Sequence, residues 1–223
     1  YGHRGGVFPA IVVGPAAKAQ ADGRPQAPSR VSFEVTLKVD SVADFAAIHQ
    51  VQNQIEAPPL SVYRRLNVAE ADGFRLSVAE RHGYRGFDLP DFDTNRAIAR
   101  LAHLEAFRTR RREFDDDAAG FDHASKLIDA ALADGLDVAV VCDLFFAAER
   151  EYWMRRNHAA QVQYARQQKL GMGWANHDHH TYRSSRRYFT RLVALWEKLG
   201  FHVRERFYAG AQAGWGAQVM EQP

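Results

Sequence analysis

The sequence predicts an α+β protein in which two strand-forming parts are separated by a long helical stretch. Residues Val31–Val39 alternate apolar and polar side chains, which is typical of a half-buried strand. Apolar residues recur at helical spacing through most of residues 94–168. Residues 201–221 return to strand-like patterning around a glycine-containing turn. We therefore expect a helical insertion over residues 93–170, with sheet-forming parts on both sides of it.

The same pattern divides the chain into four segments. Residues 1–30 include a stretch rich in Gly, Pro and Ala and predict a flexible N-terminal segment. Residues 31–92 form a first α+β half, 93–170 the helical insertion, and 171–223 a second α+β part. The chain stops soon after its last predicted strand, so we expect either a truncated final part or a partner module supplied by the first half.

In the first half, strand and helix alternate in a simple order. Ser41 is expected to cap a helix that runs to about Gln54. Strands are predicted at Leu60–Val68 and Phe74–His82, joined by a turn at Glu70–Gly73. This order of strand, helix, strand and strand makes the first half a possible partner module.

The insertion is predicted to contain three helices. They cover Thr94–Phe114, Phe121–Asp134 and Val138–Gln168. The charge block Arg108–Asp117 between the first two is expected to be a solvated helix end.

Three imidazoles occur within four residues in the segment His177-Asp178-His179-His180, and metal ligation is the chemistry that best explains them. If this segment is a strand, His177 and His179 share one face and His180 takes the other. A single histidine would then point into a site while its neighbours support it. The alternative is a polar strand end whose histidines are simply solvated.

A helix and two strands are expected after this segment. Ser184-Ser185 offers an N-cap, and Gly200 ends the helical pattern. Phe201–Tyr208 alternates as a half-buried strand, and Trp215–Glu221 forms another strand. A carboxylate that closes an otherwise uncharged strand needs a partner. Imidazole and carboxylate ligands on separate strands are the set that proteins use for divalent iron, manganese or zinc.

These residues resemble one module of the vicinal oxygen chelate superfamily, which contains glyoxalases and extradiol dioxygenases. The likeness comprises His179-His180-Thr181-Tyr182-Arg183, the helix ending in Leu199-Gly200-Phe201, and Glu221 about 42 residues after His179. It implies βαβββ modules that form a curved sheet around a metal site. Arg81-His82-Gly83-Tyr84-Arg85 and Glu221-Gln222 are also similar to motifs of the 2-oxoadipate dioxygenase/decarboxylase family.

The resemblance implies a non-haem Fe(II) oxygenase that carries out oxidative decarboxylation and hydroxylation of a 2-oxo acid. The metal ligands would be His82, His179 and Glu221, with open positions for the substrate and dioxygen. Fe(II) is the metal expected first, with Mn, Zn, Ni or Co as alternatives. His177 and His180 compete with His82 as the third ligand.

An arginine is expected to hold the substrate carboxylate, because its planar fork binds carboxylates bidentately. Arg183 shares a predicted strand face with His179, at even spacing. The family motif points instead to the region of Arg85, which stands one residue earlier than in that motif and would turn to the opposite face. Both remain candidates, with Arg183 preferred.

Two other functions are compatible with the sequence. A glyoxalase-type divalent-metal lyase or isomerase would use the same ligands without oxygen. A non-enzymatic nucleic-acid-binding module would use the basic and aromatic residues of a helix over 150–169. The acidic Glu149 and Glu151 lie beside those residues and weaken the second alternative.

Composition limits the remaining possibilities. The chain has 29 basic and 27 acidic residues among its 223, which leaves no general nucleic-acid footprint. Its single cysteine, Cys142, lies in an apolar run, so we expect a buried thiol, no intrachain disulfide and a cytoplasmic location. No apolar stretch is long enough to span a bilayer. The expected partner is a small 2-oxo carboxylic acid, with no membrane; the oligomeric state stays open.

Overall fold

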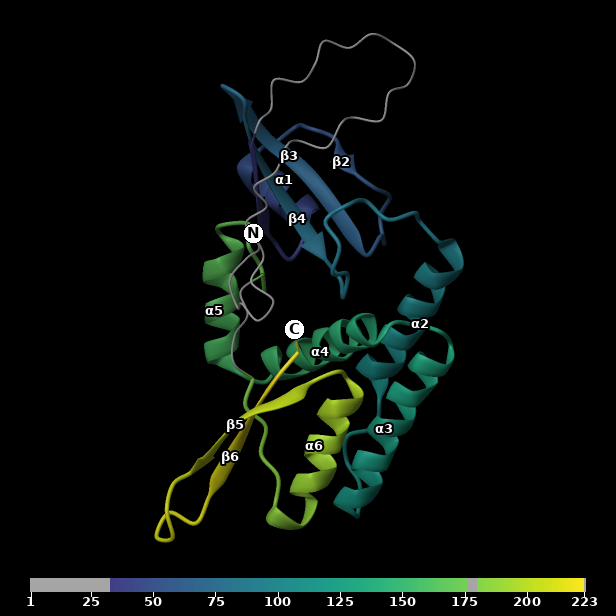
Figure 1. Cartoon of the computed structure of the whole chain (residues 1–223), viewed down its shortest axis with the longest axis vertical. Coiled ribbons are helices and arrows are strands. Elements are labelled where there is room, and N and C mark those ends of the chain that lie inside the picture. The colour runs from purple at the N-terminus through teal and green to yellow at the C-terminus, as the bar shows by residue number, and fades with distance from the viewer. Residues whose placement is uncertain (1–32, 176–179, 223) are drawn as a thin grey trace. The chain divides into compact units, whose positions relative to one another are not determined.

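A computed structural model describes residues 33–175 and 180–222, which form an α+β protein with two compact units (Figure 1). Unit 1 holds the described residues up to Phe92 and those from Asn157 to Ala175. Unit 2 holds residues 93–156 and those from His180 onward. The predicted flexible segment 1–30 lies outside the described residues. No helix within the described part is long and apolar enough to cross a membrane.

Unit 1 contains a four-stranded sheet and two helices. The elements are β1 (Phe33–Lys38), α1 (Val42–His49), β2 (Ile55–Glu56), β3 (Tyr63–Ala71), β4 (Phe74–Arg81) and α5 (His158–Gln168). The strands are ordered β1-β4-β3-β2, with β1 parallel to β4 and the other pairs antiparallel. An apolar core lies between α1 and the sheet; its buried members are Val39, Val42, Phe45, Leu66 and Val78.

The hairpin of β3 and β4 confirms the two strands predicted there. Ala71 pairs with Phe74, which leaves a turn of two residues. Those residues, Asp72 and Gly73, have φ angles of 52° and 81°. Positive φ at both positions is the requirement of the turn type whose twist matches that of the flanking strands, and Asp-Gly meets it at low cost.

Helix α1 begins as predicted but ends earlier. The Ser41 side chain accepts a hydrogen bond from the Asp44 N–H at 3.1 Å, which confirms the predicted N-cap. The helix ends at His49 rather than Gln54, because Gln50 takes the left-handed conformation at φ 56°. The chain that follows leads to the edge of the sheet, where Ile55–Glu56 form β2, a strand that the sequence did not predict.

A buried carboxylate ties α1 to the sheet of unit 1. Glu80 Oε2 accepts the N–H of Val42 at 2.7 Å, and Glu80 Oε1 accepts from Arg64 at 3.1 Å. Burial alone would raise the pKa of Glu80, but the hydrogen bonds from His82 and Val42 and the charge of Arg64 outweigh it and hold the pKa below its usual range. The ionised form therefore caps the first turn of α1 from the neighbouring strand.

Unit 2 consists mainly of helices, with one hairpin. Its elements are α2 (Thr94–Thr109), α3 (Asp117–Ala133), α4 (Val138–Met154), the 3-10 turn η1 (Arg186–Tyr188), α6 (Phe189–Lys198), β5 (His202–Tyr208) and β6 (Gly216–Glu221). Helix α4 is the central apolar element, and eight of its residues are buried, among them Cys142, Phe145 and Phe146. The predicted buried, free thiol is therefore confirmed.

The helix predicted over Val138–Gln168 is wrong as a single element. Helix α4 ends at Met154, and α5 begins at His158 in the other unit. Asn157 causes the break, because its side chain accepts the N–H of Ala160 at 3.1 Å and caps α5. The basic and aromatic residues of 150–169 are thus divided between two helices.

The charge block Arg108–Asp117 is not a solvated helix end. Helix α2 stops at Thr109 rather than Phe114, and Arg110 is extended at ψ 141°. The residues that follow form a connection to α3, whose N-cap Asp116 accepts the N–H of Ala118 at 3.1 Å. Helix α3 accordingly begins four residues before the predicted start at Phe121.

The C-terminal part has a helix and two strands, as predicted, but no strand before them. The described residues from His180 to Ser185 have no regular structure, so the prediction of a strand is wrong for these residues. Strand β5 is exposed along its whole length rather than half-buried. It pairs only with β6 among the described residues, and no second layer covers it there.

Replacing Glu80 by Gln is expected to lower the free energy of unfolding by about 2 kcal/mol at pH 7, because an amide cannot pair with Arg64 and caps α1 weakly. The folded-state pKa of Glu80 is lowered, so this stabilisation is present at neutral pH and is lost as the pH falls through that pKa. Urea denaturation followed by circular dichroism should show the difference between parent and variant shrinking in acid.

Glu70→Gln is the matched control for this variant. Glu70 also pairs with an arginine of unit 1, Arg75, but its side chain is 39% exposed. Its loss should therefore change the free energy of unfolding by less than about 0.5 kcal/mol. Equal losses in the two variants would contradict the special role of Glu80.

Candidate functional site

The predicted metal ligands fall in different parts of the structure. His177 and His179 lie outside the described residues. Glu221 ends β6 in unit 2, where its side chain is 33% exposed and pairs with Arg204. His82 follows β4 in unit 1, with its Nε2 3.8 Å from Glu80 Oε1. No group of three or more His, Cys, Asp or Glu side chains suited to a metal occurs among the described residues.

A histidine that sequence reasoning missed stands beside Glu221. The register of the hairpin sets His202, the first residue of β5, directly opposite Glu221. Side chains of directly opposed residues project to the same face, with Cβ atoms about 5 Å apart. Only the register of β5 and β6 identifies this pair, and the alternation of apolar and polar residues does not determine that register.

The two candidate clamp arginines are both exposed. Arg183 lies in the irregular segment before η1, so the argument that it shares a strand face with His179 fails. Arg85 follows β4, also without regular structure. In the same loop the Arg81 guanidinium lies 5.0 Å from the ring centroid of Phe87 and donates to the Tyr84 carbonyl at 2.9 Å, which orders the loop around Arg85.

The residues that directly follow the two predicted ligands, His179 and Glu221, both lie near the same side of α4. The ring of His180, which follows His179, lies 5.3 Å from that of Phe146. Gln222, which follows Glu221, lies close enough to the Cys142 thiol to lower its pKa, and it donates to the Leu199 carbonyl at 2.6 Å. Cys142 and Phe146 are four residues apart, so they lie one turn from each other on the same side of the helix.

Gly200 makes this docking possible. Its φ of 84° is a left-handed conformation that ends α6, as the sequence predicted. A Cβ at this position would lie 2.9 Å from a methyl group of Val138 and 3.2 Å from Gln222 Nε2. Glycine therefore serves both the helix end and the close approach of the C-terminal strand to α4.

Aromatic side chains surround the docking face of α4. Phe146 stacks on Trp196 with ring centroids 5.5 Å apart, and Phe201 lies 5.6 Å from Phe146. Tyr182 packs on Trp196 at 4.7 Å. Burial raises the pKa of Tyr182, and the charge of Glu149 adds to this effect, so the phenol stays neutral. The segment after the histidines is therefore fixed against an apolar wall.

Sequence reasoning also missed a buried ion cluster on α4. Glu149 is only 3% exposed, and its Oε1 accepts from Arg110 at 2.8 Å and from Arg112 at 2.7 Å. Its other oxygen accepts the indole N–H of Trp153 at 3.2 Å. Burial would raise the pKa of Glu149, but the hydrogen bonds from Arg112 and Arg110 reverse the shift and keep it ionised. This cluster holds the connection between α2 and α3 on α4.

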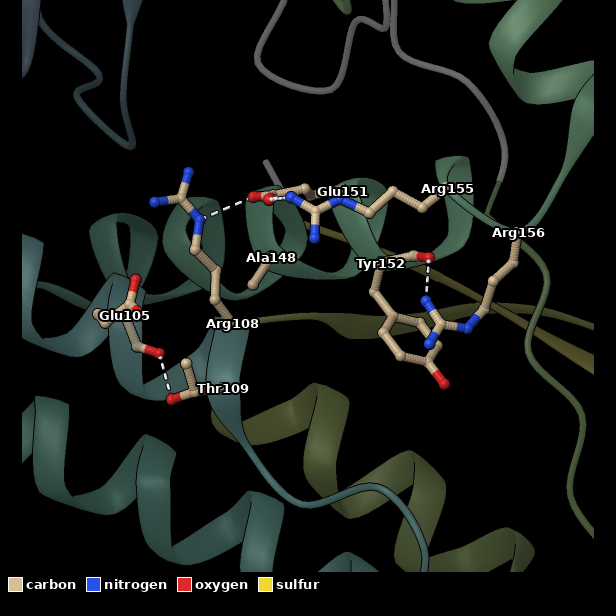
Figure 2. A pocket seen from close by; sticks show the side chains of 8 residues that line it. All are labelled: Glu105, Arg108, Thr109, Ala148, Glu151, Tyr152, Arg155 and Arg156. Atoms are coloured by element: carbon tan, nitrogen blue, oxygen red, sulfur yellow. Dashed lines mark hydrogen bonds and ion pairs between the residues drawn. The ribbon is translucent and has the colours of Figure 1, made fainter.

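A pocket of about 420 Å³ opens beside this cluster, between the C-terminal parts of α2 and α4 (Figure 2). Its lining is Glu105, Arg108, Thr109, Ala148, Glu151, Tyr152, Arg155 and Arg156. Arg108 and Arg155 both bind the Glu151 carboxylate. Apart from Ala148, every lining side chain is polar or charged.

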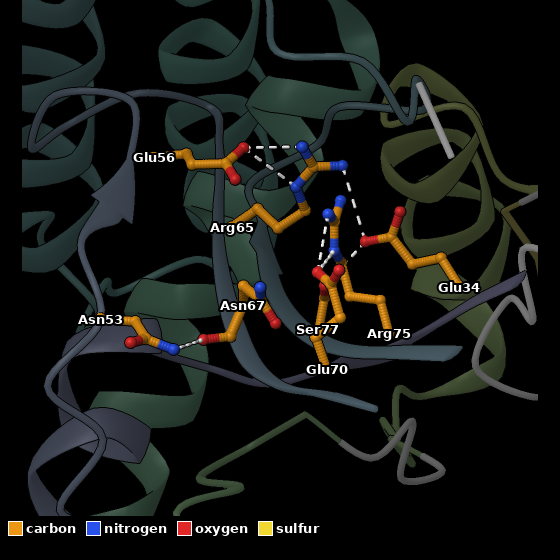
Figure 3. Close-up of polar contacts among 8 residues, drawn as sticks. All are labelled: Glu34, Asn53, Glu56, Arg65, Asn67, Glu70, Arg75 and Ser77. Atoms are coloured by element: carbon orange, nitrogen blue, oxygen red, sulfur yellow. Dashed lines mark hydrogen bonds and ion pairs between the residues drawn. The ribbon is translucent and has the colours of Figure 1, made fainter. Parts of the chain in front are cut away.

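In unit 1, the sheet face opposite α1 carries paired charges (Figure 3). Arg65 binds Glu56 at 2.7 Å and also lies 3.7 Å from Glu34. Glu34 is 8% exposed and accepts the hydroxyl hydrogen bond of Ser77 at 2.7 Å. The carboxylates already have cationic or hydroxyl partners, so these pairs stabilise the sheet itself.

Comparisons with known proteins assign no family to this chain. No family model, curated protein or solved structure matches it.

Gln222→Ala is expected to speed maleimide labelling of Cys142 about fivefold, because loss of its hydrogen bond to Leu199, worth about 1 kcal/mol, loosens the C-terminal strand next to the thiol. In the parent chain labelling should be slow, since burial raises the pKa of the thiol to about 12. Gln218→Ala is the control, because its side chain bonds the backbone of its own hairpin. Equal labelling rates in all three proteins would show that Gln222 does not anchor the strand.

Proposed function

We propose that this chain is a metal-dependent enzyme that binds one divalent transition metal through His179 and Glu221 and, with Fe(II), oxidises a 2-oxo carboxylic acid. One observation carries the proposal. The residues that immediately follow the two predicted ligands, His180 and Gln222, lie near Phe146 and Cys142, which are one turn apart on α4. Ligands from distant segments need such a common support to meet at one ion.

Glu221 fits a ligand role in chemistry and access. Its carboxylate is partly exposed at the end of a strand, and its one ion-pair partner among the described residues is Arg204, whose side chain is 50% exposed. Exchanging this pair for a metal removes no buried interaction, so it costs little. Gln222, the next residue, is anchored, which limits the positions that the carboxylate can reach.

Two histidines compete to be the third ligand. His202 belongs to the same unit as Glu221 and stands opposite it in the hairpin. His82 belongs to unit 1, where its Nε2 lies 3.8 Å from the Glu80 carboxylate, which would orient its ring as outer carboxylates orient metal-bound histidines. His82 is inferred from the resemblance of Arg81-His82-Gly83 to the family motif.

When bound, a divalent metal with open positions polarises a 2-oxo acid and, as Fe(II), supplies electrons for the reduction of dioxygen. The chain's own residues would orient the substrate and exclude water. Arg183 offers a guanidinium for a distal carboxylate, on a segment held by the half-buried Tyr182, whose ring packs on Trp196. The packed rings of Phe146, Trp196 and Phe201 exclude water from that side of the segment.

The first test is metal content. His179→Ala and Glu221→Ala should each weaken binding of one divalent metal by at least roughly tenfold, because even outer partners of metal ligands cost about 10–100-fold when removed. Binding is measured by elemental analysis of protein purified without added metal and by titration with Fe(II) under anaerobic conditions. His82→Ala and His202→Ala, run in parallel, identify the third ligand.

Glu205→Ala and His158→Ala are the matched controls for metal binding. Glu205 also pairs with Arg204, at 3.1 Å, and His158 begins a helix of the other unit. Both should retain the metal. Full occupancy in His179→Ala and Glu221→Ala together would exclude the proposed site.

The second test is turnover. Fe(II)-loaded protein should consume oxygen and release carbon dioxide when given a 2-oxo dicarboxylic acid. Arg183→Ala should raise KM roughly tenfold or more, because the substrate loses a charge-assisted hydrogen bond. Metal binding should be unchanged. Arg186→Ala is the control, since Arg186 is exposed and bonds the Gly214 carbonyl. Isomerisation of a hemithioacetal without oxygen uptake would assign the glyoxalase-type reaction instead.

A further inference from the structure

The pocket between α2 and α4 has a composition that the proposed metal chemistry does not use. Three arginines reach it from two elements: Arg108 from the last turn of α2, and Arg155 and Arg156 from the end of α4 (Figure 2). The Thr109 hydroxyl also lines the opening, but its hydrogen is already donated to the Glu105 carbonyl at 2.8 Å. The guanidinium groups are therefore the strong donors gathered around this opening.

The guanidinium groups are held in fixed positions. Arg108 directs only its Nε to Glu151, which leaves its two terminal nitrogens for another acceptor. The carbon centres of Arg112 and Arg156 lie 3.6 and 3.7 Å from the ring centroid of Tyr152. Two guanidinium groups so close to one centroid must lie on opposite faces of the ring. Arg156 also donates to the Tyr152 carbonyl at 3.2 Å.

Positive charge is in excess around the pocket. Five arginines, Arg108, Arg110, Arg112, Arg155 and Arg156, meet three glutamates, Glu105, Glu149 and Glu151. Two positive charges therefore remain. The C-terminal ends of α2 and α4 each contribute about half a negative charge, which does not cancel this excess. No carboxylate of the residues that the structure describes pairs with Arg156.

Neutralisation of helix ends explains only part of this arrangement. Arg155 and Arg156 satisfy groups of the final turn of α4, as basic residues often do. Arg108 lies in the last turn of α2 and serves that helix end in the same way, while Arg112 reaches Tyr152 from the connection after α2. The arginines together exceed what the two helix ends need, which favours an external anion as a further partner.

We propose that this pocket binds a phosphate-bearing small molecule, with Arg108, Arg155 and Arg156 as the phosphate-binding residues. A phosphate group has three terminal oxygens and carries negative charge, so it suits several guanidinium forks around an opening with excess positive charge. Both faces of Tyr152 are covered by arginines, so its ring cannot stack on a base. This favours a small phosphate compound over a nucleic-acid strand.

The test is calorimetric titration of the full chain with inorganic pyrophosphate at low salt. Saturable binding at one site is expected, and it should weaken as the salt concentration rises. Arg108→Gln and Arg156→Gln should each reduce the affinity for pyrophosphate roughly tenfold, because each variant loses a charge-assisted hydrogen bond. Arg191→Gln should leave it unchanged, because Arg191 is a half-exposed arginine of unit 2 that pairs with Asp122 outside the pocket.

Arg156→Lys keeps the charge but loses the planar fork, so it should bind more weakly than the parent and more tightly than Arg156→Gln. Near-parent circular dichroism spectra and Tm values of these variants separate loss of binding from loss of the fold. Absence of saturable pyrophosphate binding, an equal loss in Arg191→Gln, or equally tight binding of citrate would overturn the proposal. Tighter binding of a single-stranded oligonucleotide that also depends on Arg108 would overturn it in favour of nucleic acid.

Discussion

A carboxylate that is taken out of water must find partners, and this constraint holds segments in place in both units. Glu80 joins the first turn of α1 to the central strands of unit 1. Glu149 draws the chain after α2 back onto α4. An unpaired charge at either position would cost several kcal/mol, so these contacts determine where the connecting segments run.

Helix α4 combines this ionic role with an apolar one. One side of its C-terminal half holds Glu149, while Cys142 and Phe146 receive the C-terminal strand and the segment after the histidines. The proposed metal ligands and the proposed phosphate pocket therefore depend on the same helix, although they use different side chains. A substitution that shifts α4 would affect both sites, whereas changes in Arg108 or Glu221 should affect only one.

The sequence predicted elements whose signals are local. The Asp72-Gly73 turn, the Ser41 cap and the glycine after α6 each require only a few neighbouring residues. The break at Asn157 was missed because helical spacing continues across it, and only the cap separates the two helices. The extended connection after Thr109 was missed because Glu149, its partner, lies 37 to 39 residues away along the chain.

Prediction of the candidate site had a similar limit. Glu221 was correctly placed at the end of a strand, and Cys142 was correctly expected to be buried. That Gln222 reaches Cys142, and that His202 stands opposite Glu221, depends on strand register and helix packing, which no local pattern contains. The strand expected around Arg183 is replaced by irregular chain, since Tyr182 turns inward to pack on Trp196 instead of continuing an alternation.

The hairpin of β5 and β6 has a consequence for protein engineering. It is anchored at the Gln222 end, whereas its turn at residues 210–214 is exposed, and a Cβ added at Gly210 or Gly214 would meet nothing within 4 Å. Exposed turns of this kind are where chains accept added sequence most readily. A short peptide tag or a labelling cysteine placed there would lie at the opposite end of the hairpin from the anchored strand end, and would leave α4 and both proposed sites intact.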